Sequence, residues 1–570
     1  MSYKPIKFKD RIIEKPNTFK STENSDGTIT LIPEPGQVLQ EGTPLNAANF
    51  NHLENGIIEV NAQLANIVTD LQLIDGVDNT IAIQNGLNNK GWVRITKPGT
   101  YLISSSLVID SNTKFELYDG VTIKLKSGTS KYMLINKDQI NGNENIEVNG
   151  GTWDVDGNNN PATGIYPTGY PGHAIFFNKV KNIKYKNITV KNAKKYAFLT
   201  VECDGFIADN INFNTFSDGL HFQPPLKNAN IRNVSGTTGD DMIAFTLGDY
   251  QNYLVSGIGD FEKITVDGVY AKNAKSVIKI TGSGTNNDNI FKHMSFNNIN
   301  GTVEKEGISI INDSSGGNGT LLKTVCKCLN FKNISIDGGS NASVFISANS
   351  ADINFDNICF NNKLHFYCNA KDNLNLNINN VNSDFTIEDS FVKNFGILTN
   401  LNLSNVKLQF GTTGKVYNQS TGIYKNIAFN NVEFAGDTKS SQYVFYFNNN
   451  TQEINSVFVN NGKFENLGSF AYIKGGALFK INNCFQKNIT TIFNFQPNSN
   501  VRIESNNSNL DGVYFSDDTP VVSISGICFN YKKLLKQLTP RENDILISSA
   551  TSETNKGLLF YNGTDWIKIA

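Results

Sequence analysis

Three aspartates stand at positions where they could act together. Asp218 lies in NTFSDGLHF, and Asp240 and Asp241 lie in GTTGDDMIAF, so that Asp241 follows Asp218 by 23 residues. If the chain coils with this period, Asp218 and Asp241 stack on adjacent strands about 4.8 Å apart. Carboxyl groups so close cannot all ionise freely, so one stays protonated beside an ionised neighbour near neutral pH. Hydrolysis of a glycosidic bond requires such a pair of acid and base.

Each aspartate also has a structural explanation. Asp-Gly is a common turn dipeptide, so Asp218 alone would be structural more often than not. Asp240 and Asp241 could likewise form a turn, with or without a bound ion. The equivalent positions of Asp218 and Asp241 favour the functional interpretation, and we expect neither a metal nor a cofactor at this site.

Basic residues fall near the same position on neighbouring coils. The same count places Lys195 one coil before Asp218 and Ser276 one coil after Asp241, with Lys279 close by. A cationic rim around a carboxylate cleft would suit an acidic or phosphorylated sugar. Solvated lysines are common on coil surfaces, which is the alternative for each of them.

Two histidines are further candidates for contact with a substrate. His221 lies three residues beyond Asp218 and could either line the cleft or cover a turn. His173 lies in PGHAIFF, after Tyr166 and Tyr170. These rings could form a wall on which sugars stack, or they could belong to a packed loop.

The elements that position these residues follow from a repeat. A short phrase, usually Asn before Ile or Val and then an alternating run, recurs at steps of 23, 23, 35, 30, 35, 24, 23, 25 and 26 residues. Such a period predicts a solenoid whose coils bury their apolar faces against their neighbours, and the alternation of period two excludes helical repeats. Asn at the strand boundaries tolerates left-handed backbone angles and can form amide ladders. The repeat anchors are Ile188, Ile211, Val234, Val269, Ile299, Ile334, Ile358, Val381, Val406 and Val432.

The start of the solenoid has its own pattern. DNTIAIQNGLNNKGW predicts a short helix with Asp78 as the N-cap, followed by strands in WVRITKPGTYLISSSLVI and FELYDGVTIKL. The helix would close an apolar end that otherwise exposes unpaired strand edges. This stretch, with GGTWDVDGNN, resembles the entry of pectate-lyase-like proteins, a resemblance that covers roughly residues 75–510. The expected fold is therefore all-β, a right-handed parallel β-helix.

A different pattern precedes the solenoid. Seven apolar residues at steps of three and four follow the start signals Pro44 and Asn46. This heptad seam predicts a self-associating helix, and its mixture of Ile, Val, Leu and Phe favours three strands over two. The alternative is an amphipathic helix that packs on its own domain. The seam consists of Phe50, Leu53, Ile57, Val60, Leu64, Ile67 and Leu71.

Composition narrows the classes of partner. A formal net charge of -2 and a pI of about 6.3 provide no basic field for nucleic acid. No stretch approaches the ~18 apolar residues of a membrane span, and the N-terminus lacks a cleavage-site pattern. We expect a protein that is made and folded in a cytoplasm, without membrane insertion. The seven cysteines form an odd, unpatterned set, which favours reduced thiols over disulfides or zinc.

At the aspartates the sequence resembles the polygalacturonase-like glycoside hydrolases. The matching text is SDGLH, TGDDMIAF and, less closely, SVIKI. The resemblance implies that Asp240 is the general acid, that Asp218 and Asp241 activate water for inverting hydrolysis, and that Lys279 binds substrate. Two departures stand out: the expected Gly-His-Gly is absent, LGDYQNYLVSG standing there instead, and Val277 replaces an arginine. The carboxylate chemistry is thus better supported than a galacturonate substrate.

The termini complete the expected organisation. PGQVLQEGTPLNAANFNHLE resembles the attachment module of tail proteins of phages and prophages of Gram-positive bacteria. This implies docking to a phage baseplate or tail. The last residues predict a small β module, with Tyr561 and Trp566 near an Asn-Gly turn. The expected domains are an attachment module (1–45), a coiled-coil neck (46–73), the β-helix (74–510) and the C-terminal β module (511–570).

Three functions remain open at this point. The first is a homotrimeric tail spike that binds a bacterial surface polysaccharide and hydrolyses it at Asp218, Asp240 and Asp241. The second is an adhesin that holds the same glycan without cleaving it. The third is a purely structural tail component, which loop insertions between Val234 and Ile334 argue against, because such insertions build walls around a cleft. The first two place the protein on a virion tail that acts at the bacterial surface.

Overall fold

The computed structural model divides into two units, Met1–Thr69 and Asp70–Ala570. It describes residues 6–164, 168–247, 259–282, 290–312, 324–437, 441–449, 455–496 and 500–506, and isolated strands between 508 and 568. Among the described helices, none is long and apolar enough to cross a bilayer.

The first unit consists of two small antiparallel pairs and a helix. Strand β1 (Ile12–Ile13) pairs with β4 (Val38–Gln40), and β2 (Phe19–Glu23) forms a hairpin with β3 (Ile29–Pro33). Helix α1 (Ala47–Ile67) begins after Asn46, whose side-chain oxygen accepts a hydrogen bond from the Asn49 N–H at 3.0 Å. Asn46 therefore caps the helix, as the start signal predicted.

The apolar seam of α1 is shorter than predicted. Phe50 is 54% exposed and Ile57 is 55% exposed, so these two side chains, seven residues apart, face outward from the helix. The helix ends at Ile67, and Leu71 packs instead against the core of the solenoid. The side chains of residues 58–67, which include the rest of the seam, lie outside the described residues.

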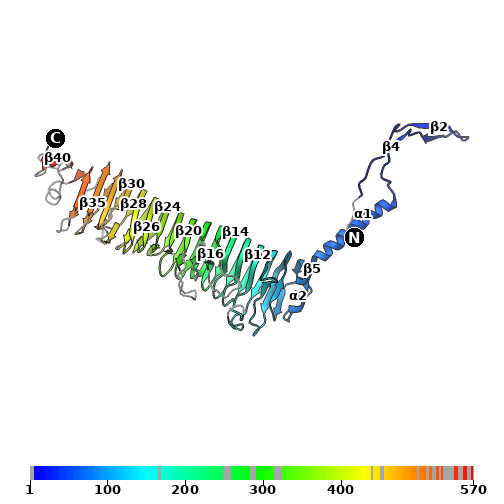
Figure 1. The fold of residues 1–570 in the computed structure, drawn as a ribbon, viewed down its shortest axis with the longest axis horizontal. Coiled ribbons are helices and arrows are strands. Elements are labelled where there is room, and N and C mark those ends of the chain that lie inside the picture. The colour runs from blue at the N-terminus through cyan, green and yellow to red at the C-terminus, as the bar shows by residue number, and fades with distance from the viewer. Residues whose placement is uncertain are drawn as a thin grey trace. The chain divides into compact units, whose positions relative to one another are not determined.

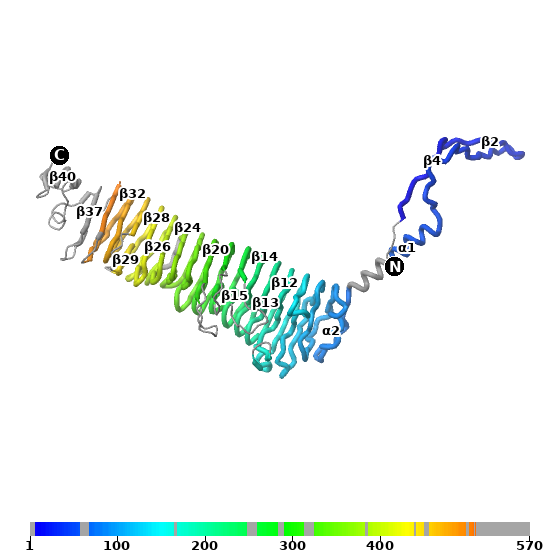
Figure 2. The backbone as a smooth tube through the Cα atoms, in the orientation of Figure 1, coloured from blue at the N-terminus to red at the C-terminus, as the bar shows by residue number. Residues whose placement is uncertain are grey.

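The second unit is a parallel β-solenoid of about 15 turns, which confirms the predicted all-β fold. Figures 1 and 2 show its strands stacked coil upon coil from the N-terminal helix α2 to the last described strands. Each coil contributes one long, bent strand and one short strand. The first residues of β12, β13 and β14, together with the short strands from β15 onward, form what we call the short-strand sheet.

The strands of the solenoid have the following bounds. The opening strands are β5 (Val68–Asp70), β6 (Gly91–Ile95), β7 (Gly99–Ile103) and β8 (Leu107–Ile109). The long strands are β9 (Thr113–Leu125), β11 (Asn143–Asp154), β12 (Ile175–Lys191), β13 (Phe198–Asn214), β14 (Leu220–Thr237), β16 (Phe261–Ala274), β18 (Phe291–Val303), β20 (Val325–Gly338), β22 (Ser350–Asn361), β24 (Asn373–Ile387), β26 (Ile397–Phe410), β28 (Ile423–Ala435), β30 (Asn455–Glu465), β32 (Gly476–Asn482), β35 (Asn500–Asn506) and β37 (Val521–Ser525). The short strands are β10 (Leu134–Asn136), β15 (Asp241–Leu247), β17 (Ser276–Gly282), β19 (Ile308–Asn312), β21 (Val344–Ser347), β23 (Leu364–Cys368), β25 (Ser390–Asn394), β27 (Lys415–Gln419), β29 (Tyr443–Asn448), β31 (Ser469–Lys474), β33 (Phe485–Lys487), β34 (Thr491–Phe495) and β36 (Val513–Phe515).

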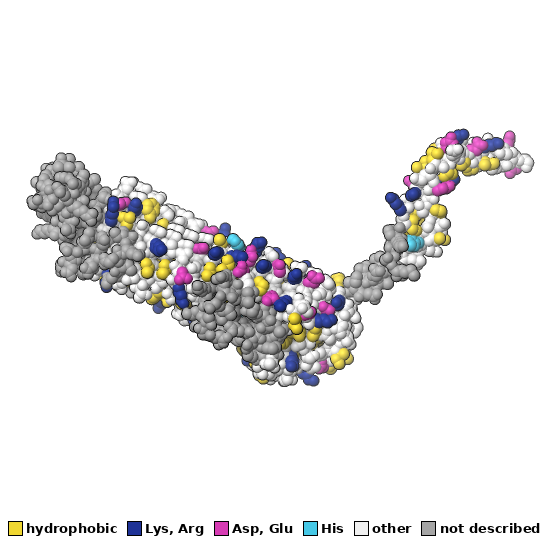
Figure 3. Space-filling view, in the orientation of Figure 1, with side chains coloured by type: hydrophobic (Ala, Val, Ile, Leu, Met, Phe, Trp, Pro, Cys, Tyr) yellow, Lys and Arg dark blue, Asp and Glu magenta, His cyan; other side chains and the backbone are white. Residues whose placement is uncertain are grey.

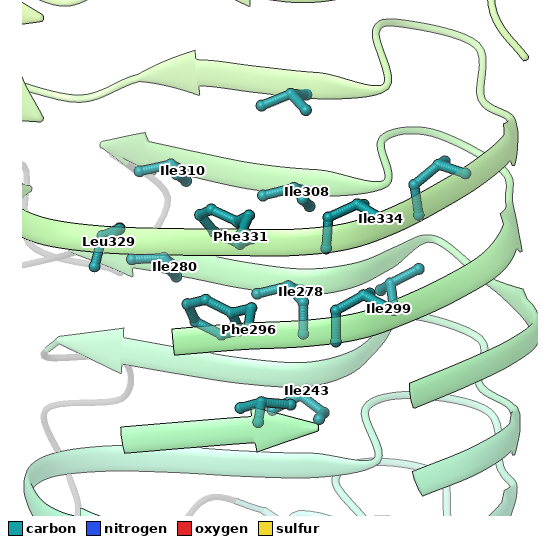
Figure 4. Close-up of a cluster of buried hydrophobic side chains, with 14 of the residues drawn as sticks. Ile243, Ile278, Ile280, Phe296, Ile299, Ile308, Ile310, Leu329, Phe331 and Ile334 are labelled. Atoms are coloured by element: carbon teal, nitrogen blue, oxygen red, sulfur yellow. The ribbon is translucent and has the colours of Figure 1, made fainter. Parts of the chain in front are cut away.

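The repeat anchors occupy one continuous buried column. Ile188 pairs with Ile211, Ile211 with Val234, and the register continues without a break to Val432. All ten anchors are buried. Neighbouring interior columns contain aliphatic and phenyl side chains, as Figure 4 shows for Ile278 above Ile243 and for Phe331 beside Phe296. The period of the sequence therefore predicted the coil register correctly.

Asparagine ladders run along a turn of the coil, as predicted. Asn187, Asn210, Asn333 and Asn357 all have positive φ angles. The amide of Asn210 donates to the side-chain oxygen of Asn187 at 2.9 Å, and that of Asn357 donates to Asn333 at 2.7 Å. These bonds satisfy side chains that replace a costly left-handed turn of any larger residue.

Helix α2 (Thr80–Asn88) closes the first coils of the solenoid. Its Ile83 and Leu87 are buried in the core, and the Gln84 amide exchanges hydrogen bonds of 2.9 and 2.8 Å with the backbone of Val108. The N-cap is Asn79 rather than the predicted Asp78, which instead accepts hydrogen bonds from the N–H and hydroxyl of Thr80. The boundary differs by one residue, but the predicted closing helix is present.

A separate four-stranded sheet forms the end of the chain. It consists of β38 (Cys528–Phe529), β39 (Ile545–Ser549), β40 (Lys556–Tyr561) and β41 (Trp566–Lys568). Tyr561 lies opposite Trp566 in the antiparallel pair β40–β41, as the predicted Asn-Gly turn requires. The six described cysteines are free thiols, in agreement with the expectation of reduced cysteines.

Candidate active site

The turns that lead into β14 and β15 bring the three aspartates together. Leu220 pairs with Ile243 and Asp241 pairs with Ser276, so Asp218 and Asp241 occupy equivalent positions on adjacent coils. The turns themselves stack tightly, because a side chain at Gly239 would collide with the carbonyl group of Phe216. The Gly219 N–H donates a hydrogen bond of 3.0 Å to the carbonyl oxygen of Asp241. The predicted registration is confirmed.

The cluster of Asp218, Asp240 and Asp241, here called the Asp trio, is compact. One carboxylate oxygen from each residue lies within 4.8 Å of the others. Asp218 is only 4% exposed and Asp241 only 6%, whereas the side chain of Asp240 is 36% exposed. The trio thus has two buried members and one that solvent, or a substrate, reaches.

Burial and mutual repulsion favour the neutral form of the two buried aspartates. Desolvation, followed by the charge of Asp240, raises the pKa of Asp218 to about 7, although Lys195 opposes the shift. Desolvation also raises the pKa of Asp241 to about 8; the charge of Lys279 opposes this shift, while those of Asp218 and Asp240 add to it. Because the groups are coupled, the retained proton belongs to the trio rather than to one carboxyl. Such a site can supply a proton near neutral pH.

Three lysines surround the trio. Lys275 Nζ lies 3.0 Å from Asp240 Oδ1. Burial would lower the pKa of Lys275, but the hydrogen bond and charge of Asp240, with the charges of the other two aspartates, raise it overall. Lys279 follows Ala244 in the register of the short-strand sheet and acts on Asp241. The predicted cationic rim is therefore present, with Lys275 as a member that sequence reasoning did not select.

Lys195 lies near the trio but not at the predicted position. Phe198 pairs with Leu220, a step of one residue fewer than in the preceding long strands, so the position equivalent to Asp218 holds Tyr196. The turn before β13 is one residue longer than the turn before β14 and shifts Lys195 accordingly. Its Nζ lies 4.7 Å from the centre of the Tyr196 ring, and its charge acts on Asp218.

A stack of rings stands behind Asp218. Nδ1 of His221 lies 2.7 Å from Asp218 Oδ2, and its ring is parallel to that of Tyr196 with centres 3.7 Å apart. His173 stacks on the other face of the column, 4.6 Å from Tyr196, and Tyr132 lies 6.2 Å beyond it. We call these four residues the upstream stack. It fixes the imidazole that contacts Asp218.

The two histidines are buried rather than presented to a substrate. His221 is 2% exposed, and its contact with Asp218 makes it a support of the carboxylate. His173 is wholly buried, and its Nδ1 accepts the Tyr196 N–H at 3.2 Å, which corresponds to the packed-loop alternative. Burial strongly lowers the pKa of His173, with the charges of His221 and Lys195 adding to the effect. Tyr166 lies outside the described residues.

Sequence reasoning also missed Tyr196 and Glu306. Glu306 precedes Ile308 by two residues as Ser276 precedes Ile278, so it continues the column of Asp241 and Ser276. It is 2% exposed and accepts a hydrogen bond of 2.6 Å from Asn341. Extending the count of the anchors by two more coils would have found it. No comparable pattern marked Tyr196, because its role depends on the turn that is one residue longer.

The geometry of the trio would also permit a bound cation, since three carboxylates converge. The ammonium group of Lys275 at 3.0 Å from Asp240, however, already supplies a positive charge there. A carboxylate cluster with its own lysine partners is suited to acid–base chemistry.

Comparisons with known proteins agree with this site. Residues 77–259, which include the Asp trio, match the family model of Glycosyl hydrolases family 28. No curated protein matches the chain. The match agrees with the resemblance to polygalacturonase-type enzymes and supports a β-helix protein that binds or hydrolyses a polysaccharide.

Several solved structures are similar at low identity. They include a tailspike protein mutant of E. coli bacteriophage HK620 in complex with a hexasaccharide, with 10% identity, a TM-score of 0.48, and coverage of 91% of this chain and 86% of that chain. The pre-mature gene product 12 of bacteriophage phi29 has 12% identity and a TM-score of 0.47, covering 84% and 75%. A family 28 exopolygalacturonase of Yersinia enterocolitica has 14% identity and a TM-score of 0.33, covering 86% and 83%. These values carry no information about the activity of this chain.

Proposed function

We propose that this protein is a phage-type tail spike that binds a bacterial surface polysaccharide and hydrolyses it at the Asp trio. The observation that carries the proposal is the geometry of the trio, whose carboxylate oxygens lie within 4.8 Å of one another on adjacent coils. The raised pKa values of Asp218 and Asp241 keep a proton in the cluster near neutral pH. A purely structural coil would have no use for buried carboxyl groups that destabilise it when ionised.

In the proposed reaction, Asp240 acts as the general acid. It is the most exposed member of the trio, so its proton can reach a glycosidic oxygen. Protonation of that oxygen accompanies cleavage of its bond to the anomeric carbon, and the leaving sugar departs as an alcohol. Asp218 and Asp241 take a proton from the water that attacks the same carbon. Lys275 returns the ionised Asp240 to its resting ion pair.

The stereochemical outcome is a separate question. Inverting enzymes typically separate their carboxyl groups by about 6.5–9.5 Å to admit the water. The nearest oxygens of the trio are closer than this, at 4.8 Å or less. Inversion is therefore proposed from the family resemblance, and NMR of the anomeric proton of the first product tests it.

The lysine rim supports an acidic polysaccharide as substrate. Lys195 and Lys279 lie on opposite sides of the trio along the solenoid and act electrostatically on Asp218 and Asp241. A sugar carboxylate or phosphate placed against either lysine would be attracted without meeting the trio head on. On the face of the solenoid in Figure 3, acidic and basic side chains are interspersed.

We further propose that the first unit attaches the protein to a phage tail and that the chain forms a homotrimer, acting at the bacterial surface. The exposed Phe50 and Ile57 of α1 support self-association, because large apolar side chains on one helix favour burial against another copy. Sedimentation equilibrium of the full chain should give three times its mass, and Phe50→Asn with Ile57→Asn should shift it toward monomer. An unchanged mass in this variant would remove α1 from the interface.

The test of the enzymatic proposal is the release of reducing ends from purified surface polysaccharides of candidate Gram-positive hosts. Asp240→Asn and Asp241→Asn should each lower the rate by about 10²–10⁴-fold, the usual range for loss of a catalytic acid or base. Asp209→Asn is the matched control, since Asp209 pairs with Arg232 at 2.9 Å on another part of the coil. It should retain full activity.

An adhesin is the second candidate, and one observation favours it. The position at which related enzymes have an arginine is Val277, which is wholly buried and cannot contact a sugar. Binding of polysaccharide by the native protein and by both aspartate variants, without release in any of them, would establish the adhesin and exclude the hydrolase.

A further inference from the structure

The outward face of the short-strand sheet continues well beyond the Asp trio. One column of this face runs in register from Ala244 through Lys279 and Ser309 to Phe345, Tyr367 and Lys393. Because adjacent coils are separated by about 4.8 Å, Phe345 lies roughly 14 Å along the solenoid from Ala244. These residues are thus on the same face as the trio but too far away to touch a bond held there.

Aromatic rings take over this column where the lysine and serine end. The rings of Phe345 and Tyr367 are parallel with centres 4.4 Å apart, and Phe395 stacks on Tyr367 at 4.8 Å. We call these three residues the downstream stack. Its members are half-buried, whereas the phenyl rings of the solenoid interior, such as Phe366, are fully buried. The downstream stack is therefore not needed to fill the core.

An open pocket of about 710 Å³ adjoins the downstream stack. Phe345 and Tyr367 form part of its apolar wall, and Asn341, Lys363, Asp389 and Lys393 contribute polar groups. Lys393 Nζ lies 3.0 Å from Asp389 Oδ2, which fixes the ammonium group at the pocket. Its volume lies within the range of roughly 300–1,000 Å³ that is usual for ligand sites, as does the combination of ring surface with a few polar groups.

This combination matches the chemistry of a sugar chain. A pyranose ring presents C–H groups on its faces, which pack against aromatic surfaces, and hydroxyl groups on its rim, which require donors and acceptors. Two lysines against one aspartate leave the pocket with a positive balance that accommodates an acidic sugar. The register of Ala244, Lys279, Ser309 and Phe345 connects the pocket to the trio along one face, so one extended chain could lie over both.

We propose that the pocket beside the downstream stack is a second, non-catalytic binding site for a segment of an acidic polysaccharide. The choice of ligand rests on the proposed function, since it assumes that the trio acts on the same polymer. The site holds the chain about five coils beyond the trio, so it contributes to affinity and to the preference for long chains, and it takes no part in bond cleavage.

The experiment measures binding of immobilised capsular polysaccharides and wall teichoic acids from Gram-positive bacteria to full-length protein in the Asp240→Asn background. Tyr367→Leu, which keeps apolar volume but removes the ring, and Lys363→Ala, which leaves the stack intact, should each weaken binding by about 3–10-fold. Tyr270→Ala is the matched control, because Tyr270 is 55% exposed on β16, away from this pocket. It should bind as the parent does.

Equal binding by the parent, Tyr367→Leu and Lys363→Ala would overturn the proposal. So would a changed oligomeric mass of Tyr367→Leu in sedimentation, because the stack would then be a contact between copies of the chain. The two hypotheses separate cleanly. Release of reducing ends by the wild-type chain with unaltered binding in both pocket variants sinks the second site alone, and weakened binding without any release sinks hydrolysis alone.

Discussion

The upstream and downstream stacks lie on either side of the Asp trio, and they differ in exposure. His173, Tyr196 and His221 of the upstream stack are at most 3% exposed, whereas Phe345, Tyr367 and Phe395 of the downstream stack are half-buried. The upstream rings end on a carboxylate, since His221 contacts Asp218 at 2.7 Å. The downstream rings end on an open pocket. Similar ring geometry therefore serves two purposes, and burial separates positioning of a catalytic group from contact with a ligand.

The largest effect that would break this comparison is on turnover. His221→Phe keeps a ring stacked on Tyr196 but removes the nitrogen that contacts Asp218. Loss of a buried hydrogen bond to an ionisable group costs about 1.5–3 kcal/mol, so kcat should fall by about 10–100-fold. KM should change little, and the pH profile of kcat should shift, which loss of packing alone would not produce. Tyr196→Phe, which retains both rings, is the control; a His221→Phe enzyme with native kcat and pH profile would reduce the upstream stack to packing.

A second prediction sharpens the comparison through stability. Truncation of a buried aromatic side chain typically costs about 3–5 kcal/mol, whereas a partly exposed one away from the core costs about 1 kcal/mol or less. Tyr196→Ala should therefore lower the thermal midpoint by several degrees and Tyr367→Ala by much less, measured by calorimetry at one pH. Equal losses would mean that both stacks are structural.

The smallest effect concerns the pH dependence of stability. The folded-state pKa of Asp241 lies near 8, above its ordinary value of 3.8, because of burial and the neighbouring aspartates. The folded protein therefore binds more protons than the unfolded chain between these values, and its stability falls as the pH rises from about 4 to 8. Asp241→Asn should remove part of this fall and raise the thermal midpoint at pH 8 by about 1–3 °C.

Thermal scans at pH 4.5 and pH 8 measure this difference directly. At pH 4.5 the variant and the parent should melt alike, because Asp241 is then neutral in the folded state. Lower stability of Asp241→Asn at pH 8 would show that the ionised carboxylate stabilises the coil. Asp209→Asn should change neither midpoint, since its carboxylate is near the surface.

The repeat and the pairing of Asp218 with Asp241 were predictable because both depend on period alone. Each anchor buries one aliphatic side chain per coil, and that requirement is written in the spacing of the residues. The position of Lys195 was not predictable in the same way. One extra residue in a turn moves a side chain to the next position without any change in composition, and Tyr196 takes the place beside Asp218.

Other features depend on contacts between distant residues. Lys275 reaches Asp240 from the following coil, and Leu71 leaves the helical seam to pack on the solenoid core. Neither has a local signal, because a lysine before a strand and a leucine in a heptad position each fit an ordinary interpretation. His173 shows the same limit, since its burial follows from the rings above and below it.

The asparagine ladders have a mechanical consequence. Their amides donate toward the preceding coil, as Asn210 does to Asn187 and Asn357 does to Asn333, and the parallel strands bond in the same axial direction. Tension applied between the ends of the solenoid would load these bonds in series, so rupture would proceed one coil at a time at modest force. A load across the axis would instead be shared by many coils at once. The solenoid should therefore resist bending and crushing far better than it resists being unwound from an end.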